Sequence, residues 1–214
     1  MTRGGSLISP EGRLRLKGLA VPVATFLGRL GLTPNALTVI GFIGTGIAAV
    51  AAASQAWLLA GVLVLAFGIF DSFDGALARA TGRVTRFGAF LDSTLDRTGE
   101  NLVLAGVAFG ASQAQFPVGV IGAVLAMAFA SVVTYARARA EAVGLHGEVG
   151  VAPRPERLVL LAGGLILAGW PGGVLGSGQA WLAGALGLIA ALSAVTVVQR
   201  IVHVHRQTEG DTNQ

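Results

Sequence analysis

Six apolar segments follow one another along this chain, and each is about long enough to cross a lipid bilayer. They lie near residues 36–54, 57–78, 89–112, 117–140, 156–171 and 178–201. A hydrocarbon core of roughly 30 Å needs about 20 apolar residues in a helix. A water-soluble domain cannot bury this much apolar surface, because 53% of the 214 residues are hydrophobic and only 12% are charged. The sequence therefore predicts an all-α integral membrane protein with six transmembrane helices.

Residues 11–31 precede the first apolar segment and mix basic with apolar side chains. This run is too charged to cross a membrane. It predicts an amphipathic juxtamembrane helix at the membrane interface, bent near Pro22, with a disordered basic tail as the alternative. No linker or internal repeat divides the chain. We therefore expect a single membrane domain over residues 1–214, ending in a polar tail at 207–214.

The basic residues are distributed unevenly among the connections between these segments. The connections at 54–57, 112–117 and 170–179 contain no Lys or Arg, whereas the loops and termini at the other end contain nearly all of them. This asymmetry places both termini and the charged loops in the cytoplasm, and an even number of crossings agrees with it. We expect a multi-pass protein of the cell (inner) membrane, with no nucleic acid among its partners.

Four of the five aspartates lie within residues 71–96, at the facing ends of the second and third predicted helices. They are Asp71, Asp74, Asp92 and Asp96. The first two are three residues apart and the last two are four apart, so each helix presents its carboxylates on one stripe. Gly82 allows the chain to reverse between the helices, so the two stripes can face each other. An ionisable cluster at the end of membrane helices is a functional-site hypothesis.

Clustered carboxylates repel one another, and divalent cations relieve that repulsion. The chain has no cysteine, and no histidine lies near the cluster in the sequence. Oxygen ligands alone predict Mg²⁺ or Mn²⁺ rather than a metal that prefers thiolates. The alternative is that the carboxylates are neutralised by the neighbouring arginines, which are Arg79, Arg83, Arg86 and Arg97.

The spacing within this stretch resembles the motif that defines the CDP-alcohol phosphotransferases. That motif, D-x2-D-G-x2-A-R-x8-G-x3-D-x3-D, is matched at every fixed position by Asp71, Asp74, Gly75, Ala78, Arg79, Gly88, Asp92 and Asp96. A chance match to eight fixed positions has a probability on the order of 10⁻¹⁰ per start position at average residue usage. The resemblance implies attack by an alcohol hydroxyl on the β-phosphate of a CDP-activated partner, with CMP leaving.

The resemblance also implies roles for individual residues. The four aspartates would hold two ions per site, Mg²⁺ or Mn²⁺, and Asp96 would also be the general base. The residues expected around the CDP-lipid are Asn35, Ala36, Leu37, Thr38, Gly75, Ala78, Arg79, Thr85 and Gly88. Independently of the family, residues 33–35 predict a helix start with Asn35 as its N-cap.

A second basic group spans residues 134–158. Its guanidinium groups can bind an anionic acceptor, or they can be the ordinary positive charge of a cytoplasmic loop. Within the family, the chain resembles the phosphatidylinositol phosphate synthases in GLTPN, FGAFLDSTLDR, RPERL and the QR pair at 199–200. That resemblance implies a homodimer that uses CDP-diacylglycerol and inositol 1-phosphate. The acceptor phosphate would be bound by Arg137, Arg154 and Arg200, although a flanking charge is an equal interpretation of Arg200.

Two other functions stay open at this point. The first is the same chemistry with glycerol 3-phosphate or free inositol as the acceptor. The second is a divalent-cation transporter, which requires carboxylates near the bilayer midplane and polar groups on other helices. The first, fourth, fifth and sixth segments have no internal acids, which argues against such a route. Glu100 continues the face of Asp92 and Asp96 by one turn, either as support for the site or on a solvated face.

Overall fold

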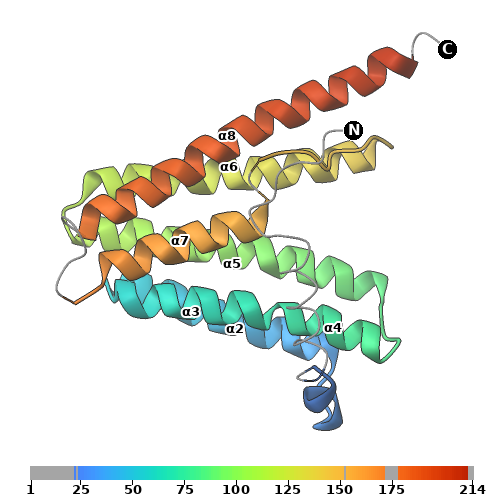
Figure 1. Cartoon of the computed structure of the whole chain (residues 1–214), viewed down its shortest axis with the longest axis horizontal. Coiled ribbons are helices and arrows are strands. Elements are labelled where there is room, and N and C mark those ends of the chain that lie inside the picture. Colours follow the sequence, from blue (N-terminus) through green and yellow to red (C-terminus); the bar gives the residue numbers. More distant parts are fainter. Residues whose placement is uncertain (1–21, 23, 152, 172–177, 212–214) are drawn as a thin grey trace.

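A computed structural model describes residues 22, 24–151, 153–171 and 178–211, and these residues contain helices and no strand. The helices are α2 (Pro34–Ala53), α3 (Trp57–Phe70), α4 (Ser72–Ala80), α5 (Arg86–Gln113), α6 (Pro117–Ala142), α7 (Arg154–Ala168) and α8 (Gly178–Asp211) (Figure 1). Residues 24–29 form a further helical turn before α2. Most of the predicted juxtamembrane helix lies outside the described residues. The all-helical prediction is confirmed.

Two helix starts near the charged end are capped by threonine side chains. The Thr33 hydroxyl accepts a hydrogen bond from the backbone N–H of Ala36, and α2 begins with a proline. The N-cap of α2 is therefore Thr33 and not Asn35, because the chain already turns helical at the proline. Thr85 caps α5 in the same way by accepting a hydrogen bond from the N–H of Gly88.

The second predicted segment is interrupted where the aspartate stretch begins. Helix α3 ends at Phe70 and α4 begins at Ser72, so Asp71 lies at the junction of the two helices. The other segments each coincide with one helix, although α8 continues as a helix to Asp211, beyond the predicted end at residue 201. The interruption places the first carboxylate of the motif where one helix ends and the next begins.

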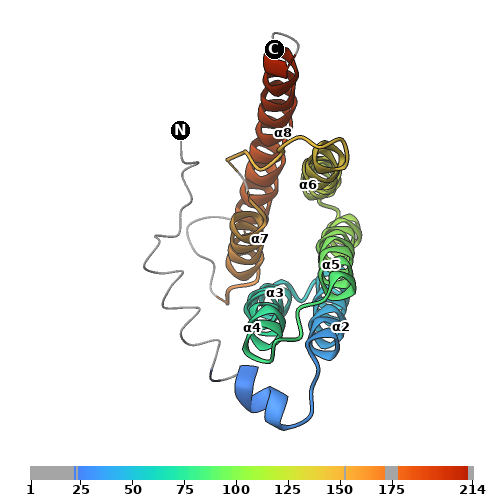
Figure 2. The same cartoon turned by 90° about the vertical axis from the view of Figure 1, so that its right-hand side faces the viewer.

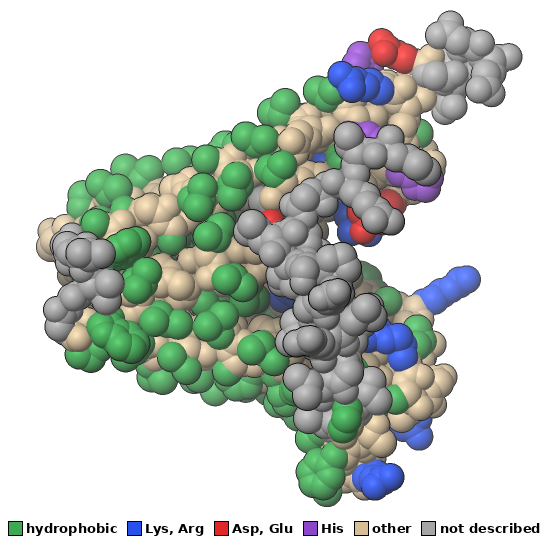
Figure 3. Space-filling view, viewed as in Figure 1, with side chains coloured by type: hydrophobic (Ala, Val, Ile, Leu, Met, Phe, Trp, Pro, Cys, Tyr) green, Lys and Arg blue, Asp and Glu red, His purple; other side chains and the backbone are tan. Residues whose placement is uncertain are grey.

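Among the residues that the structure describes, four stretches are long and apolar enough to cross a membrane by length and composition, and they support a membrane-embedded protein. They are Pro34–Ala53, Trp57–Ala80, Pro117–Ala142 and Gly178–Glu209. Helices α5 and α7 are not among these four stretches. Helix α7 has only 15 residues, and α5 carries two motif aspartates near its start. Figure 3 shows hydrophobic side chains over most of the surface in view and charged side chains at one end. This separation is the one that the distribution of Lys and Arg predicts.

The helices pack in two rows that close into a ring. One row consists of α2, α5 and α6, and the other of α3, α7 and α8 (Figure 2). Helices α2 and α3 join the rows at one side, and α6 and α8 join them at the other. Helix α4 extends from α3 and packs on α2. Helices α5 and α7 therefore belong to opposite rows of the ring.

Glycine allows these helices to approach closely, as the many glycines in the apolar segments predict. A Cβ atom on Gly106 of α5 would lie 2.2 Å from the backbone oxygen of Ala49 in α2. A Cβ atom on Gly61 of α3 would lie 2.8 Å from the backbone oxygen of Ala162 in α7. In both cases the obstructing atom belongs to the backbone and cannot rotate away, so a larger residue would push the helices apart.

Candidate active site

Three of the four motif aspartates form a compact group of carboxylates. Asp71, Asp74 and Asp92 each offer an oxygen, and these oxygens lie within 4.8 Å of one another. Asp71 comes from the α3–α4 junction, Asp74 from the first turn of α4, and Asp92 from α5. The turn at Gly82, with φ of +67°, brings the two helices into this antiparallel arrangement. A group of hard oxygen donors at this spacing fits Mg²⁺ or Mn²⁺.

The carboxylate of Asp74 is fixed by α2. Its Oδ2 accepts a hydrogen bond of 2.6 Å from the Thr38 hydroxyl, and its Oδ1 accepts one from the Gly75 backbone N–H. Asp74 and Thr38 are both buried. The structure shows that the Thr38 hydroxyl orients one of the carboxylates. The predicted contact of Thr38 with the CDP-lipid stays a prediction.

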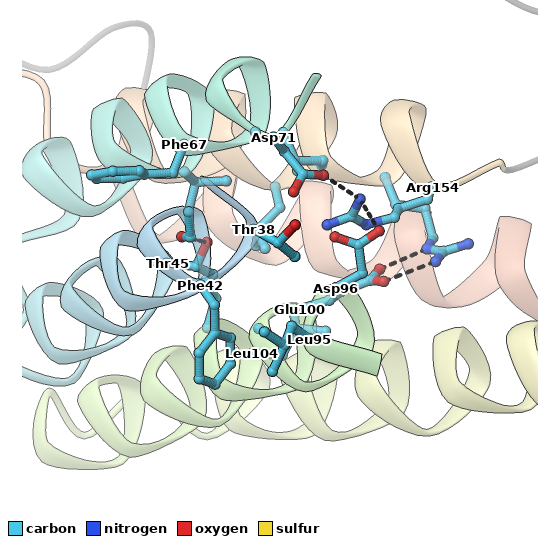
Figure 4. Close-up of a pocket in the computed structure, with 18 of the residues that line it drawn as sticks. Thr38, Phe42, Thr45, Phe67, Asp71, Leu95, Asp96, Glu100, Leu104 and Arg154 are labelled. Carbon is cyan, nitrogen blue, oxygen red and sulfur yellow. Dashed lines mark hydrogen bonds and ion pairs between the residues drawn. The ribbon is translucent and has the colours of Figure 1, made fainter. Parts of the chain in front are cut away.

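The fourth aspartate is bridged to the group by an arginine. Nη1 of Arg154, at the start of α7, lies 3.0 Å from Oδ2 of Asp71 and 2.5 Å from Oδ2 of Asp96. Figure 4 shows these two carboxylates converging on the guanidinium from α5 and from the α3–α4 junction. Arg154 therefore lies among the carboxylates and neutralises part of their charge. Both contacts are made by Nη1, so its predicted contact with an acceptor phosphate can use the other guanidinium nitrogens.

A second ion pair lies one helical turn deeper between the same two helices. Nε and Nη2 of Arg157 lie 2.9 and 3.0 Å from the two carboxylate oxygens of Glu100. The Arg157 side chain is only 3% exposed and that of Glu100 14%. The sequence left open whether Glu100 lies on a solvated face, and the structure shows that it is mostly buried and paired. The pair joins α5 to α7 directly beneath Asp96 and Arg154.

Replacing Glu100 with Gln should lower the free energy of unfolding by about 3 kcal/mol, because it removes a charge that compensates a buried guanidinium. Thermal unfolding of the purified protein in detergent measures this loss. The matched control is Glu141→Gln, which removes an exposed partner of Arg137 and should change stability by less than about 1 kcal/mol. Equal melting temperatures for Glu100→Gln and the unmodified protein would contradict the structural role of the deeper pair.

A narrow cavity of about 50 Å³ extends from the acidic group into the ring. Asp71, Asp96 and Arg154 line its charged end, and Thr45 and Phe67 line its deeper part (Figure 4). Its volume suits a few water molecules rather than a substrate. The cavity connects the carboxylates to the ring interior, and its volume is too small for a nucleotide.

A larger pocket of about 280 Å³ lies on the other side of the carboxylates, between the starts of α2 and α5, helix α4 and the α4–α5 loop. Seven of the nine residues predicted around the CDP-lipid line it, namely Asn35, Thr38, Gly75, Ala78, Arg79, Thr85 and Gly88. Asp74 and Asp92 also line it, so the pocket opens directly onto the carboxylates. Ala36 and Leu37 do not line it, and Leu37 is instead packed in a small core beside Leu77.

Gly88 and Arg83 both contribute to this pocket. A Cβ atom on Gly88 would lie 3.0 Å from Oγ1 of Thr85 and 3.1 Å from Oδ1 of Asn35, so glycine keeps the two helix starts close. Arg83 also lines the pocket, although it was not among the residues predicted there. Its position in the basic loop was the one available signal, because no fixed position of the motif includes it.

The other two arginines predicted to bind the acceptor have protein partners. Arg137 lies 2.8 Å from Glu141 and 3.2 Å from Glu148. Arg200 is buried, and it donates to the backbone oxygens of Val149, at 2.9 Å, and of Val133. Arg200 is thus not a solvated flanking charge. A joint contact of all three arginines with a phosphate stays a prediction.

The chain is similar in sequence to known enzymes over most of its length. Residues 31–199 match the family described as CDP-alcohol phosphatidyltransferase. The phosphatidylinositol phosphate synthase of Mycobacteroides abscessus is 38% identical over 195 residues, which cover 88% of this chain and 84% of that protein. The archaetidylinositol phosphate synthase of Pyrococcus horikoshii is 35% identical over 184 residues, which cover 86% of this chain and 89% of that protein.

Solved structures of a related protein share the fold. The phosphatidylinositol phosphate synthase of Mycobacterium tuberculosis, in complex with manganese and citrate, has a TM-score of 0.80 at 34% identity. The alignment covers 86% of this chain and 88% of that one. The same protein with CDP-DAG bound also has a TM-score of 0.80 at 34% identity, with 86% and 92% covered.

Proposed function

The chain belongs to the CDP-alcohol phosphatidyltransferase family, and we propose that it transfers the phosphatidyl group of CDP-diacylglycerol to inositol 1-phosphate. The products are phosphatidylinositol phosphate and CMP. The observation that carries the proposal is the position of the carboxylate group, which lies between a pocket of about 280 Å³ and the partly buried Arg154. The relatives from Mycobacteroides and Pyrococcus differ in the lipid that their names give, but both names specify an inositol phosphate product.

In the proposed reaction, Asp96 accepts the proton of the attacking hydroxyl group. The hydroxyl oxygen forms a bond to the β-phosphorus, and the bond from that phosphorus to the oxygen bridging to the α-phosphate breaks. CMP leaves with the electron pair of that bond. Two ions, Mg²⁺ or Mn²⁺, held by Asp71, Asp74, Asp92 and Asp96 would neutralise the pyrophosphate charge. The spacing of the first three carboxylates supports this ligand set.

Arg154 connects metal binding with acceptor binding in this proposal. In the structure its guanidinium group contacts Asp71 and Asp96, which are both proposed ligands. A carboxylate oxygen that binds a divalent cation is a poorer partner for a guanidinium group. Occupation of the site by cations would therefore free Arg154 to bind the phosphate of the acceptor.

We also propose six crossings of the inner membrane, with α5 and α7 spanning alongside the four long apolar stretches. Both helices belong to the same ring as those four, which supports this count. The gathering of Lys and Arg at one end supports cytoplasmic termini and a cytoplasmic active site. There the soluble acceptor can reach the carboxylates while the lipid chains stay in the bilayer. A homodimer and a single domain over residues 1–214 are proposed on the family resemblance and the lack of a linker.

Release of CMP tests the acceptor directly. The purified enzyme, with CDP-diacylglycerol and Mg²⁺, would be supplied in turn with inositol 1-phosphate, glycerol 3-phosphate and free inositol. We expect rapid CMP release with inositol 1-phosphate only. Faster release with either of the other two acceptors would reject the proposed substrate while retaining the family chemistry.

Replacing Arg154 with Gln should raise the KM for inositol 1-phosphate about 10- to 100-fold, as expected for the loss of a charged hydrogen bond. The KM for CDP-diacylglycerol should change little, because Arg154 does not line the nucleotide pocket. Steady-state kinetics with each substrate varied in turn measures both. Equal increases for the two substrates would contradict the assignment of Arg154 to the acceptor.

A further inference from the structure

The arginines beside the carboxylates differ in whether their donors are satisfied. Arg157, Arg137 and Arg200 make the contacts described above with carboxylates or backbone oxygens. Arg97 does not take part in any ion pair within 4 Å among the described residues. Its Nε atom is buried and has no hydrogen-bond partner there. Arg97 is therefore a basic residue next to the reaction centre whose chemistry the site does not yet account for.

A second buried donor without an acceptor lies on the neighbouring guanidinium. Nε of Arg154 is also buried and has no hydrogen-bond partner among the residues that the structure describes. The charges that act on Arg97 are first that of Arg154, then those of Glu100, Asp96 and Arg157. Buried donors are nearly always paired in folded proteins, so an unpaired donor on each of two arginines whose charges interact indicates a missing acceptor. An anion between them would satisfy both.

The charges at the site point to the same ligand. Two divalent ions would balance the four motif carboxylates, and the deeper pair of Glu100 and Arg157 is internally balanced. Outside the pocket that Arg79 and Arg83 line, Arg154 and Arg97 are then left as two positive charges. A phosphate monoester carries a charge of roughly −1.5 to −2 near neutral pH and offers three acceptor oxygens. It matches both the surplus charge and the two unsatisfied donors.

We propose that Arg97 binds the phosphate of the acceptor together with Arg154. The sequence offered no reason to assign Arg97 to the acceptor. Arg97 follows the last residue of the motif, and the sequence suggested for it only the neutralisation of the carboxylates. The structure distinguishes it from Arg137, whose side chain is 44% exposed and bound by two glutamates. The proposal rests on the proposed function, in which the acceptor carries a phosphate.

The test uses the full-length protein in detergent, loaded with Mn²⁺, and measures binding of inositol 1-phosphate by calorimetry. Arg97→Gln should weaken this binding about 10- to 100-fold, and Arg97→Lys by less, because lysine keeps the charge but loses the planar fork. The matched control is Arg139→Gln, which removes an exposed arginine of α6 and should leave the affinity unchanged. Binding of Mn²⁺ and CDP-diacylglycerol is measured on each variant to show that the site is folded.

The outcomes separate this inference from the choice of acceptor. If Arg97→Gln binds inositol 1-phosphate as tightly as the unmodified protein, the role of Arg97 is rejected and the proposed function stands. If the unmodified protein prefers glycerol 3-phosphate and Arg97→Gln weakens that binding, Arg97 keeps its role and the acceptor is wrong. If Arg97→Gln weakens Mn²⁺ binding as much as acceptor binding, Arg97 is structural and the inference is rejected.

Discussion

Asp96→Asn is expected to lower kcat by roughly 10²- to 10⁴-fold, the usual contribution of a general base. An amide cannot accept the hydroxyl proton, although it has nearly the same shape as the carboxylate. Binding of CDP-diacylglycerol should persist, because Asp96 does not line the pocket proposed for the nucleotide. Single-turnover release of CMP measures the chemical step, and binding of the CDP-lipid is measured separately.

Asp211→Asn is the matched control for this substitution, since Asp211 is the one aspartate outside the motif. It should retain full activity. Arg154 keeps its contact with Asp71 when Asp96 is replaced, so the local structure has a remaining ion pair. Unchanged kcat in Asp96→Asn would exclude Asp96 as the base, and the proposed mechanism would need another proton acceptor.

Asp74→Asn is expected to produce the second large effect, a loss of Mn²⁺ affinity of more than about 100-fold together with loss of activity. The basis is that replacing a partner of a ligand already costs about 10- to 100-fold, and Asp74 is a proposed ligand itself. Asn can still accept the hydrogen bond from Thr38, so the contact between α4 and α2 is preserved. Electron paramagnetic resonance of bound Mn²⁺ measures the affinity without requiring turnover.

Thr38→Val provides a graded comparison at the same position in space. It removes the hydroxyl group that donates to Asp74 but keeps the carboxylate and a similar volume. We expect its Mn²⁺ affinity to fall about 10- to 100-fold, between the unmodified protein and Asp74→Asn. If Asp74→Asn bound Mn²⁺ normally, the carboxylate group would not be the metal site.

Much of the fold could be predicted, because period and composition are local properties of the chain. The apolar segments predicted the positions of α2, α5, α6, α7 and α8 to within a few residues at most ends. The interruption at Asp71 could not be predicted from hydropathy, since the run from Trp57 to Phe70 and the following turn are both compatible with one continuous helix. The predicted N-cap of α2 was wrong by two positions, because Thr33 and Asn35 are both good capping residues.

The candidate site could also be predicted only in part. The motif spacing predicted that the carboxylates share a face, and the structure brings Asp71, Asp74 and Asp92 together. The motif spacing could not predict that Thr38 fixes Asp74 or that Arg157 pairs with Glu100, since these partners lie 36 and 57 residues apart in the chain. Such pairings depend on which helices are neighbours in the ring.

The sequence by itself determined that this chain is a helical membrane protein, and its motif spacing identified the family chemistry. Both follow from local patterns, because a helix orders residues three and four apart on one face whatever surrounds it. Only the tertiary structure decided how the arginines divide their roles. Arg154 contacts two carboxylates, Arg137 and Arg200 have other partners, and Arg97 is left with a buried donor. The strength of a charge contact depends on distance and burial, and these are set when α5, α6, α7 and α8 pack together.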